Sequence, residues 1–376
     1  MDSLGEGGAE QNLLTLVRRL PPSECRHDLA WLYDDNALLE QFRPSIARLM
    51  PLHASRWLGL VQAAVRLAAH LRADPPDLIH AKLIRAQLVA RLAAVLCGGI
   101  PVITTWECVS YNERMYVELG ARGPWLKALT RALDAASGIP DKHFIAVSRE
   151  VADYNAKKLG VDPARVSVVY NAVEPDRLAP ALPETLAALR ASLDLPGGPI
   201  LVSVGRLVDQ KNYQTAVRAM PHILAGSPHA VWLVAGAGTL EAELRGLARE
   251  LRVEKRIRFL GARRDVPALL QIADLFVFSS HYEGLGIALM EALAAGLPAV
   301  ASRIPTSLEV AEGVDTVRFF EATDERGLAA AVLASLAERD ALRVRAREFA
   351  AGVQARFSPR AMVDGFLAVA HRAAGH

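Results

Sequence analysis

Two glutamates, Glu283 and Glu291, lie on either side of an expected helix start. The β-rich run 274–280 ends just before the first of them, and strong helix formers occupy 287–295. Between the run and the helix lies a loose turn of Gly284, Leu285 and Gly286. The free amides of a helix start favour an anion such as a phosphate group. Both carboxylates could therefore face one ligand with phosphates in its middle and hydroxyl groups at both ends, as in a sugar nucleotide.

The unit that carries the two glutamates continues into a second strand. Gly296 and Pro298 are typical of a helix end, and the apolar run 298–302 follows. A turn between strand and helix in such a unit lies at the carboxyl edge of a parallel sheet, where open α/β folds bind ligands. Either glutamate alone would be interpreted as a solvated charge, so the prediction of a site depends on the whole pattern.

Two cations, Arg206 and Lys211, follow the strand expected at 199–205. Arginine can bind phosphate oxygens through two parallel hydrogen bonds, and lysine acts as a point charge. Together they could neutralise the negative charge that builds on a departing diphosphate. This spacing alone is common on protein surfaces, but its place after a strand and upstream of the two glutamates favours a diphosphate site.

The pattern E-G-L-G with E-A-x-A-x-G-x-P, which begins at Glu283, resembles the signature of the family-4 retaining glycosyltransferases. The resemblance covers nearly the whole chain and is strongest over 205–310. It implies an α/β fold of the GT-B class, with two Rossmann-like doubly wound domains that face each other across a cleft. It also implies that Arg206 and Lys211 hold the diphosphate, that Glu283 orients the sugar hydroxyls and that Glu291 binds the ribose.

The reaction implied by this resemblance moves a sugar from a nucleotide-diphosphate donor to a hydroxyl acceptor with retention at the anomeric carbon. The acceptor would be a glycan or a lipid-linked saccharide in cell-surface polysaccharide synthesis. The donor is a substrate, and no separate cofactor is expected. The sequence has no D-x-D triplet and no histidine and carboxylate cluster with metal spacing, so we expect catalysis without a metal. A glycosidase would also use two carboxylates, but it has no need of a diphosphate site.

Two further segments take roles from the resemblance. Arg263, in the segment 261–263, matches the place where relatives hold the nucleotide base mainly through the backbone. Gly7 and Gly8 match a loop on the acceptor and phosphate side, although they are equally consistent with a flexible terminus. In the family a strand precedes this loop, and this sequence has no strand there. We therefore expect the reading frame to continue upstream of Met1 for about eight to twelve residues.

Several residues depart from the family pattern. Glu107 or Cys108 stands where many relatives have a histidine that reaches the reacting sugar, and Lys82 replaces the second histidine of an H-x-H pair. His80, the first of that pair, lies in an apolar strand and is expected to be a hydrogen-bonded core residue. Two positions that are usually glycine hold Thr306 and Ser307. A catalytically degenerate binding or scaffold protein is therefore the alternative function.

The composition indicates a globular protein of two domains. The 376 residues are 52% hydrophobic and 22% charged, with a formal net charge of +2, which gives no field suited to binding nucleic acid. The three cysteines share no C-x-x-C spacing, so neither a disulfide framework nor a thiolate zinc site is predicted. We expect a cytoplasmic protein that could contact the cytoplasmic face of a membrane peripherally.

Strands and helices alternate along the chain, as in doubly wound folds. We expect an amino-terminal domain at 1–176, a carboxyl-terminal domain at 177–356 and a last helix at 357–376 that crosses back to the first domain. The proline-rich stretch 175–199 is expected to be the linker. The first domain is predicted to hold strands at 28–33, 77–83, 101–106 and 143–148, and helices at 37–50, 57–72, 85–97 and 121–136. Arginines among the apolar residues of 37–72 could make a membrane-surface helix, although a solvated face is more common.

Overall fold

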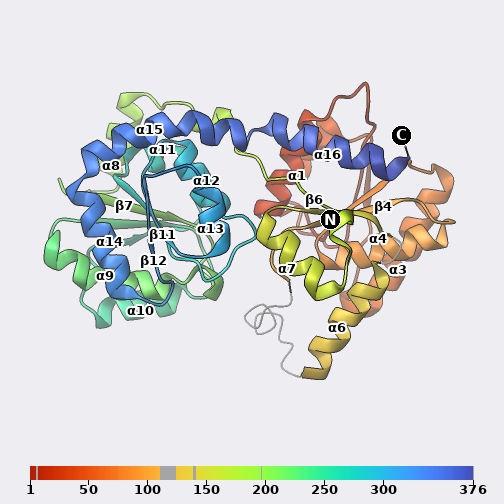
Figure 1. The fold of residues 1–376 in the computed structure, drawn as a ribbon, viewed down its shortest axis with the longest axis horizontal. Helices are drawn as coiled ribbons and strands as arrows, with labels where there is room; N and C mark the ends of the chain where they lie inside the picture. The colour runs from red at the N-terminus through yellow and green to blue at the C-terminus, as the bar shows by residue number, and fades with distance from the viewer. Residues whose placement is uncertain (6, 111–123, 139–140, 196, 376) are drawn as a thin grey trace. The chain divides into compact units, whose positions relative to one another are not determined.

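The structure, a computed structural model, describes residues 1–5, 7–110, 124–138, 141–195 and 197–375. The chain divides into two compact units, each a parallel α/β structure (Figure 1). Unit 1 consists of Met1–Ala172 with Pro359–His376, and unit 2 consists of Val173–Ser358. Within the described ranges, no helix has both the length and the hydropathy of a membrane span.

Unit 2 is built on a six-stranded sheet with the strand order β12-β11-β10-β7-β8-β9. Every pairing in this sheet is parallel, so all carboxyl ends lie at one edge. The strands are β7 (Ile200–Val204), β8 (Val231–Ala235), β9 (Ile257–Phe259), β10 (Leu275–Phe278), β11 (Ala299–Ser302) and β12 (Val317–Phe320). The chain order reverses beside β7, which is the switch point where doubly wound sheets bind ligands.

Helices cover both faces of this sheet (Figure 1). One layer contains α9 (Tyr213–Gly226), α10 (Glu241–Glu250) and α14 (Glu325–Ala337), and the other contains α8 (Pro183–Ser192), α11 (Val266–Ile272), α12 (Ile287–Ala294) and α15 (Arg339–Arg356). A short helix, α13 (Pro305–Val310), follows β11.

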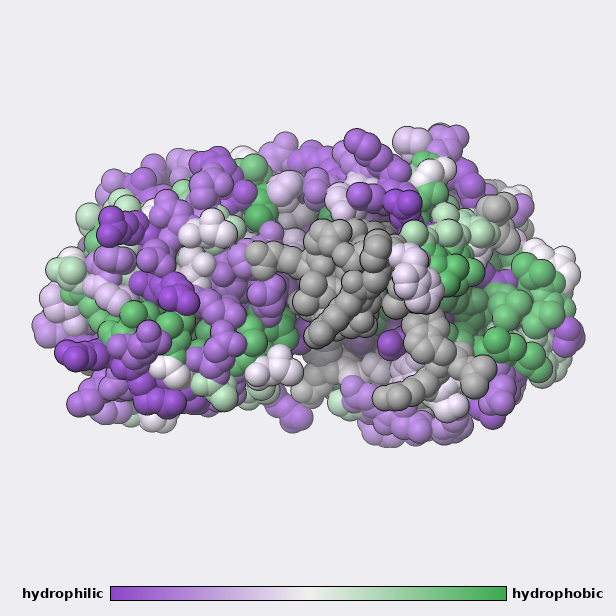
Figure 2. Space-filling model, turned by 90° about the horizontal axis from the view of Figure 1, so that it is seen from below, coloured by the Kyte–Doolittle hydropathy of each residue, from purple (hydrophilic) through white to green (hydrophobic). Residues whose placement is uncertain are grey.

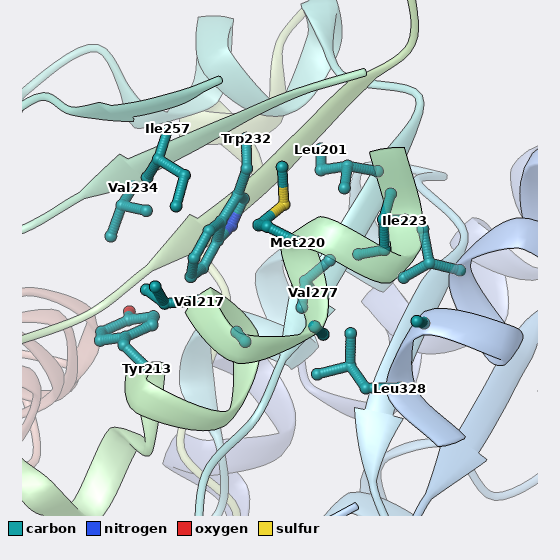
Figure 3. Close-up of a cluster of buried hydrophobic side chains, with 14 of the residues drawn as sticks. Leu201, Tyr213, Val217, Met220, Ile223, Trp232, Val234, Ile257, Val277 and Leu328 are labelled. Carbon is teal, nitrogen blue, oxygen red and sulfur yellow. The ribbon is translucent and has the colours of Figure 1, made fainter. Parts of the chain in front are cut away.

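The core beneath α9 is apolar and closely packed (Figure 3). Tyr213, Val217 and Met220 point from α9 onto Trp232 of β8, whose indole N–H donates to Ser203 Oγ at 2.9 Å. The rings of Tyr213 and Trp232 are 6.0 Å apart and tilted. Because Tyr213 opens α9, this packing fixes the position of the turn that comes just before it.

Unit 1 contains a four-stranded parallel sheet of order β3-β4-β5-β6 and a separate two-stranded parallel sheet, β1-β2. The strands are β1 (Asp28–Trp31), β2 (Arg48–Pro51), β3 (Ile79–Lys82), β4 (Val102–Trp106), β5 (Asp141–Ala146) and β6 (Val166–Val168). The helices are α1 (Gly8–Arg19), α2 (Leu39–Phe42), α3 (Arg56–Ala73), α4 (Ile84–Leu96), α6 (Pro124–Ser137), α7 (Arg149–Leu159) and α16 (Pro359–Ala374). One core cluster joins α1 and α16 to the strands, and another lies under α3 and α4.

Residues 1–4 run beside β1 rather than forming a strand of their own. The Met1 ammonium donates to the Ala30 carbonyl at 3.0 Å, and the Leu32 amide donates to the Met1 and Asp2 carbonyls. The Asp2 carboxylate accepts from the Ala86 amide at 2.8 Å, at the start of α4. Among the described residues no strand precedes α1, and the turn of Gly7 and Gly8 follows this short extended segment.

The helix predicted at 37–50 is wrong. Its sequence instead forms α2, a 3-10 turn at Arg43–Ser45 and β2. Pro44 has no amide hydrogen for a helical hydrogen bond, so α2 passes into the 3-10 turn, and the chain becomes extended at Ile46. The predicted linker 175–199 also contains a helix, α8, which begins at Pro183, where proline suits the first helical position. Of the helix predicted at 121–136, residues 121–123 lie outside the described residues.

Candidate functional site

The loops after β7, β8 and β9 meet at the carboxyl edge of unit 2. The Gly205 amide donates to the Ala235 carbonyl, and the Gly236 amide donates to the Gly261 carbonyl at 2.8 Å. Gly236 has a φ of +147, and a Cβ there would lie 1.9 Å from the Gly205 carbonyl oxygen. Only glycine fits this contact, so the turn that carries Arg206 lies directly against the turn after β8.

The turn with Lys211 is anchored from several sides. Lys211 ends a 3-10 turn at Asp209–Lys211, and Asn212 follows in the left-handed conformation with a φ of +51. The Asn212 side chain donates to the carbonyls of Ser279, at 3.0 Å, and Ala322, at 2.6 Å. With Tyr213 locked in the core, the backbone at Lys211 has little freedom to move.

Lys211 and Glu283 form a direct ion pair, with 2.6 Å between Nζ and Oε1. Their side chains are only 17% and 8% exposed, so the pair is largely removed from water. The hydroxyl of Ser280 also donates to Glu283 Oε1 at 2.6 Å, and the amide of Gln210 donates to Oε2 at 3.3 Å. A buried charge is tolerated when it is paired and hydrogen-bonded in this way. The carboxylate is therefore held in one orientation.

The start of α12 lies directly after Glu283. Gly284, Leu285 and Gly286 are buried, and Gly286 takes a φ of +84 at the position before the helix. A Cβ on Gly286 would lie 3.1 Å from the Phe278 ring, so the turn is pressed against the end of β10. Glu291 is half-buried on the second turn of α12. The first amides of α12 and the two carboxylates thus belong to one short segment, as the sequence predicted.

The remaining predicted cations of unit 2 differ from each other. Arg206 is exposed, and its side chain has no ion-pair or hydrogen-bond partner among the described residues. Arg263 instead binds Asp265, with 2.7 Å between Nε and Oδ1. This hydrogen bond from Arg263 holds the pKa of Asp265 below its usual value. Arg206 therefore has its charge available for a ligand, whereas that of Arg263 is already partly neutralised.

The predicted residues of unit 1 form a separate group. Gly7 and Gly8 begin α1, with Glu10 in its first turn. At the carboxyl ends of β3 and β4, Lys82 and Glu107 form an ion pair at 2.6 Å with side chains only 6% and 10% exposed. Burial raises the pKa of Glu10, and the nearby charge of Glu107 adds to this rise. Unit 1 thus places a buried, charged pair at the position where the family pattern has histidine.

His80 behaves as a structural residue. Its Nε2 lies 2.7 Å from Thr105 Oγ1, and its ring is 4.9 Å from that of Phe366 in α16. Burial lowers the pKa of His80 well below its usual value, and the positive charge of Lys82 lowers it further. The neutral imidazole is therefore the favoured form.

Sequence reasoning missed Gln210 and Ser280, which hold Glu283 in place. Both are polar residues in the two turns that the sequence analysis assigns to the ligand, and this position could have identified them. It also missed Tyr213, whose pKa is raised by burial and by the neighbouring charge of Glu283. In the part of the chain that the structure describes, no group of histidine, cysteine, aspartate and glutamate side chains could hold a metal ion.

Two family models match the chain. Residues 6–177 match the model described as Glycosyltransferase Family 4, and residues 187–352 match the one described as Glycosyl transferases group 1. The second match spans the turn of Arg206 and Lys211 and the segment from Glu283 to Glu291.

Curated proteins and solved structures agree with these matches. The chain is 30% identical over 311 residues to the 2-deoxystreptamine glucosyltransferase of Streptomyces kanamyceticus, covering 80% of this chain and 78% of that protein. It is 26% identical over 280 residues to the UDP-Gal:alpha-D-GlcNAc-diphosphoundecaprenol alpha-1,3-galactosyltransferase of Escherichia coli, covering 72% and 68%. Anabaena Alr3699/HepE, solved in complex with UDP-glucose, has a TM-score of 0.84 at 19% identity and covers 100% of this chain and 98% of that one. This last likeness shows that the fold is that of GT-B proteins.

Proposed function

The chain belongs to the group 1 glycosyltransferases of family 4, and on this premise we propose that it transfers a sugar from a nucleotide-diphosphate donor to a hydroxyl acceptor with retention at the anomeric carbon. The observation that carries the proposal is the fixed Lys211–Glu283 pair beside the start of α12. It combines a cation, a carboxylate and free helix amides at the carboxyl edge of one sheet, which is the chemistry that a sugar diphosphate requires.

Each residue takes a role from its position. Arg206, exposed and without a partner among the described residues, binds the diphosphate and stabilises the charge that grows as it departs. Lys211 contributes a second positive charge, which it shares with Glu283. Glu283 accepts hydrogen bonds from the sugar hydroxyls, and Glu291 binds the ribose. Arg263 lies on the loop that we assign to the nucleotide base, acting through its backbone.

The transfer step needs no enzymatic nucleophile. The bond between the anomeric carbon and the diphosphate oxygen breaks, and the acceptor oxygen forms its bond to the same face of that carbon. The proton of the acceptor hydroxyl passes to the leaving phosphate oxygen, so charge and atoms balance within the two substrates. The protein supplies positioning and electrostatic stabilisation of the leaving group.

The acceptor is proposed to be a glycan or a lipid-linked saccharide. This proposal follows from the printed activity of the galactosyltransferase relative, which acts on a sugar diphosphoundecaprenol. We assign the acceptor to the carboxyl edge of the four-stranded sheet in unit 1, where Gly7 and Gly8 begin α1 and where Glu107 lies beside Lys82. There, Glu107 offers a carboxylate for acceptor or sugar hydroxyl groups.

The test begins with a panel of nucleotide sugars. UDP-sugars come first, since the galactosyltransferase relative is named for a UDP donor. A matching donor should raise the melting temperature by mass action, and its hydrolysis or transfer should then be detected in the same preparation. A donor that binds without turnover to any tested acceptor or to water would support the degenerate binding protein instead. No stabilisation by any nucleotide sugar would overturn the proposal.

We also propose that the reaction needs no divalent metal. Arg206, Lys211 and the amides of α12 supply the positive charge at the diphosphate. Activity should therefore survive chelation of divalent cations. Complete loss with EDTA, restored by magnesium or manganese, would contradict this part of the proposal.

A further inference from the structure

The helices α3, α4 and α6 form one side of unit 1. α4 contacts both α3 and α6, so it lies between them. The Arg72 guanidinium of α3 donates to the Leu96 carbonyl at the end of α4 at 2.7 Å. On the other side, Arg91 of α4 binds Asp134 of α6 through an ion pair whose side chains are 2% and 5% exposed. The three helices are therefore fixed to one another.

This side of unit 1 exposes large apolar side chains from all three helices. Most of the exposed large hydrophobic residues among those described belong to it: Val61, Val65, Leu92, Val95, Leu96, Trp125, Leu129 and Leu133. In α6, Trp125, Leu129 and Leu133 recur every fourth position and therefore share one face, at 69%, 46% and 54% exposure. Figure 2 shows a broad apolar area (green) on the part of unit 1 that contains α3 and α4 in Figure 1. Exposed apolar residues gathered on neighbouring helices mark an interaction surface.

The charges of the same three helices are of one sign. The only carboxylate in their sequences is Asp134, which is buried against Arg91. Their exposed cations are Arg66, Arg72, Arg85 and Arg131. Arg85 lies near the Asp2 carboxylate, whereas no ion pair joins Arg66, Arg72 or Arg131 to a carboxylate among the described residues. The next carboxylates along the chain, Asp74 and Asp77, follow the end of α3, and Asp74 is paired with Arg26. In a chain with 43 basic and 41 acidic residues, this separation of charge is specific to the surface.

We propose that the exposed side of α3, α4 and α6 docks on an anionic phospholipid membrane. Leucine, valine and tryptophan side chains suit the boundary between headgroups and acyl chains, and arginines at the same level bind the lipid phosphates. A second copy of this chain fits less well, because a symmetric contact would bring Arg66, Arg72 and Arg131 together, and these helices expose no carboxylate to balance them. A nucleic acid would leave the apolar side chains without a partner.

The surface includes only some of the arginines of 37–72, namely Arg66 and Arg72. Arg43 pairs with Glu40, and Arg48 pairs with Asp28, so these two are not part of it. Leu60, on the inner face of α3, is buried and is not part of it either. Apart from Val61 and Val65 of α3, the exposed apolar residues of the surface come from α4 and α6. This docking surface is separate from the proposed sugar-nucleotide site, and its test does not depend on catalytic activity.

The experiment measures sedimentation of the full chain with vesicles. Vesicles of phosphatidylcholine mixed with phosphatidylglycerol should bind the protein, and vesicles of phosphatidylcholine alone should bind it at least about tenfold more weakly. The Val95→Glu and Leu129→Glu double variant should lose most of the binding. The Arg85→Gln and Arg131→Gln double variant should bind roughly tenfold more weakly, with a smaller dependence on salt.

Val344→Glu is the matched control, because Val344 lies on α15 in unit 2 and is 59% exposed, against 57% for Val95. Val344→Glu should bind anionic vesicles as the unchanged protein does. All variants should have the same melting temperature as the unchanged protein. Absence of binding to anionic vesicles, or equal loss in the Val344→Glu control, would overturn the proposal. Sedimentation without lipid provides the remaining outcome: a dimer that Val95→Glu dissociates, with no vesicle binding, would assign the surface to a second copy of the chain.

Discussion

The ion pair between Lys211 and Glu283 joins two side chains to which the sequence pattern assigns different parts of one ligand. A sequence gives the type and spacing of such residues, but it does not show that a lysine and a carboxylate touch each other. The contact divides the work between the two cations. Lys211 is held by Glu283, whereas Arg206 is exposed, so we propose that Lys211 contributes a fixed positive charge and that Arg206 follows the diphosphate as it leaves.

We expect Arg206→Ala to lower kcat by about a hundredfold or more while changing the donor Kd only a few-fold, because charge on the diphosphate grows toward the transition state. Glu291→Ala should instead raise the donor Kd, since a ribose contact is already made in the ground state. Steady-state kinetics and calorimetric donor titrations separate the two effects. If both variants weaken donor binding and leave kcat unchanged, Arg206 has no part in the chemical step.

His80 gives a prediction about pH. Its pKa is lowered in the folded state by burial, so an unfolded chain takes up a proton near pH 6.5 that the folded chain does not. The stability contributed by the neutral ring is present above about pH 6.5 and is lost as the pH falls, by up to about 1.4 kcal/mol per pH unit.

His80→Gln should keep a hydrogen bond to Thr105 and make unfolding less sensitive to acid. Urea unfolding at a series of pH values measures the difference from the unchanged protein. His222→Gln, at an exposed position of α9, is the control. If the free energy of unfolding falls with pH equally in the protein and in His80→Gln, His80 is not the cause of the acid sensitivity.

The order of elements follows from local patterns, and the exceptions have local causes. The helix predicted at 287–295 is observed as α12, and Ser148 caps α7 by accepting from the Val151 amide. Apolar periodicity predicted a helix at 37–50 because it takes no account of Pro44, which has no amide hydrogen for a helical hydrogen bond. It also gave no warning that the loops after β7 and β8 touch at Gly205 and Gly236, since that contact joins residues far apart in the chain.

Gly236→Ala tests this contact. The added methyl would meet the Gly205 carbonyl oxygen, and the φ of +147 is unfavourable for alanine, so we expect unit 2 to lose more than about 2 kcal/mol of stability and most of its donor affinity. Denaturant unfolding and donor titration measure the two losses. Gly246→Ala is the matched control, because its nearest atom is 4.0 Å away in α10, where alanine should stabilise the helix by up to about 1 kcal/mol. If Gly236→Ala changes neither the stability nor the donor affinity, the two turns can separate without cost.

At the scale of the whole molecule, unit 1 is made from two distant parts of the chain. The last helix, α16, contributes Met362, Val363, Phe366 and Val369 to the core cluster that includes α1. Phe366 is 9% exposed and lies against His80 of β3. A segment that follows unit 2 in sequence therefore stabilises unit 1.

Phe366→Ala should cost unit 1 about 3 kcal/mol through the lost burial and the cavity left behind. Hydrogen exchange followed by mass spectrometry should show faster exchange in β3 and β4 and unchanged exchange in β7 and β8. Arg360→Ala, on the same helix with a side chain 91% exposed, should change neither. Equal acceleration in both units would show that they unfold together.

Because unit 1 consists of two separate segments of the chain, the two units complete their folding in a defined order during synthesis. Unit 2 is one continuous segment, so the ribosome has synthesised all of it before it adds the residues of α16. Unit 1 begins to emerge first, yet its core lacks α16 until that helix, which follows unit 2 in the chain, has left the exit tunnel. Domains usually fold in order from the amino terminus, but here unit 2 can complete its core before unit 1 does. The first part of unit 1, which already contains α3, α4 and α6, must wait for α16 to be synthesised.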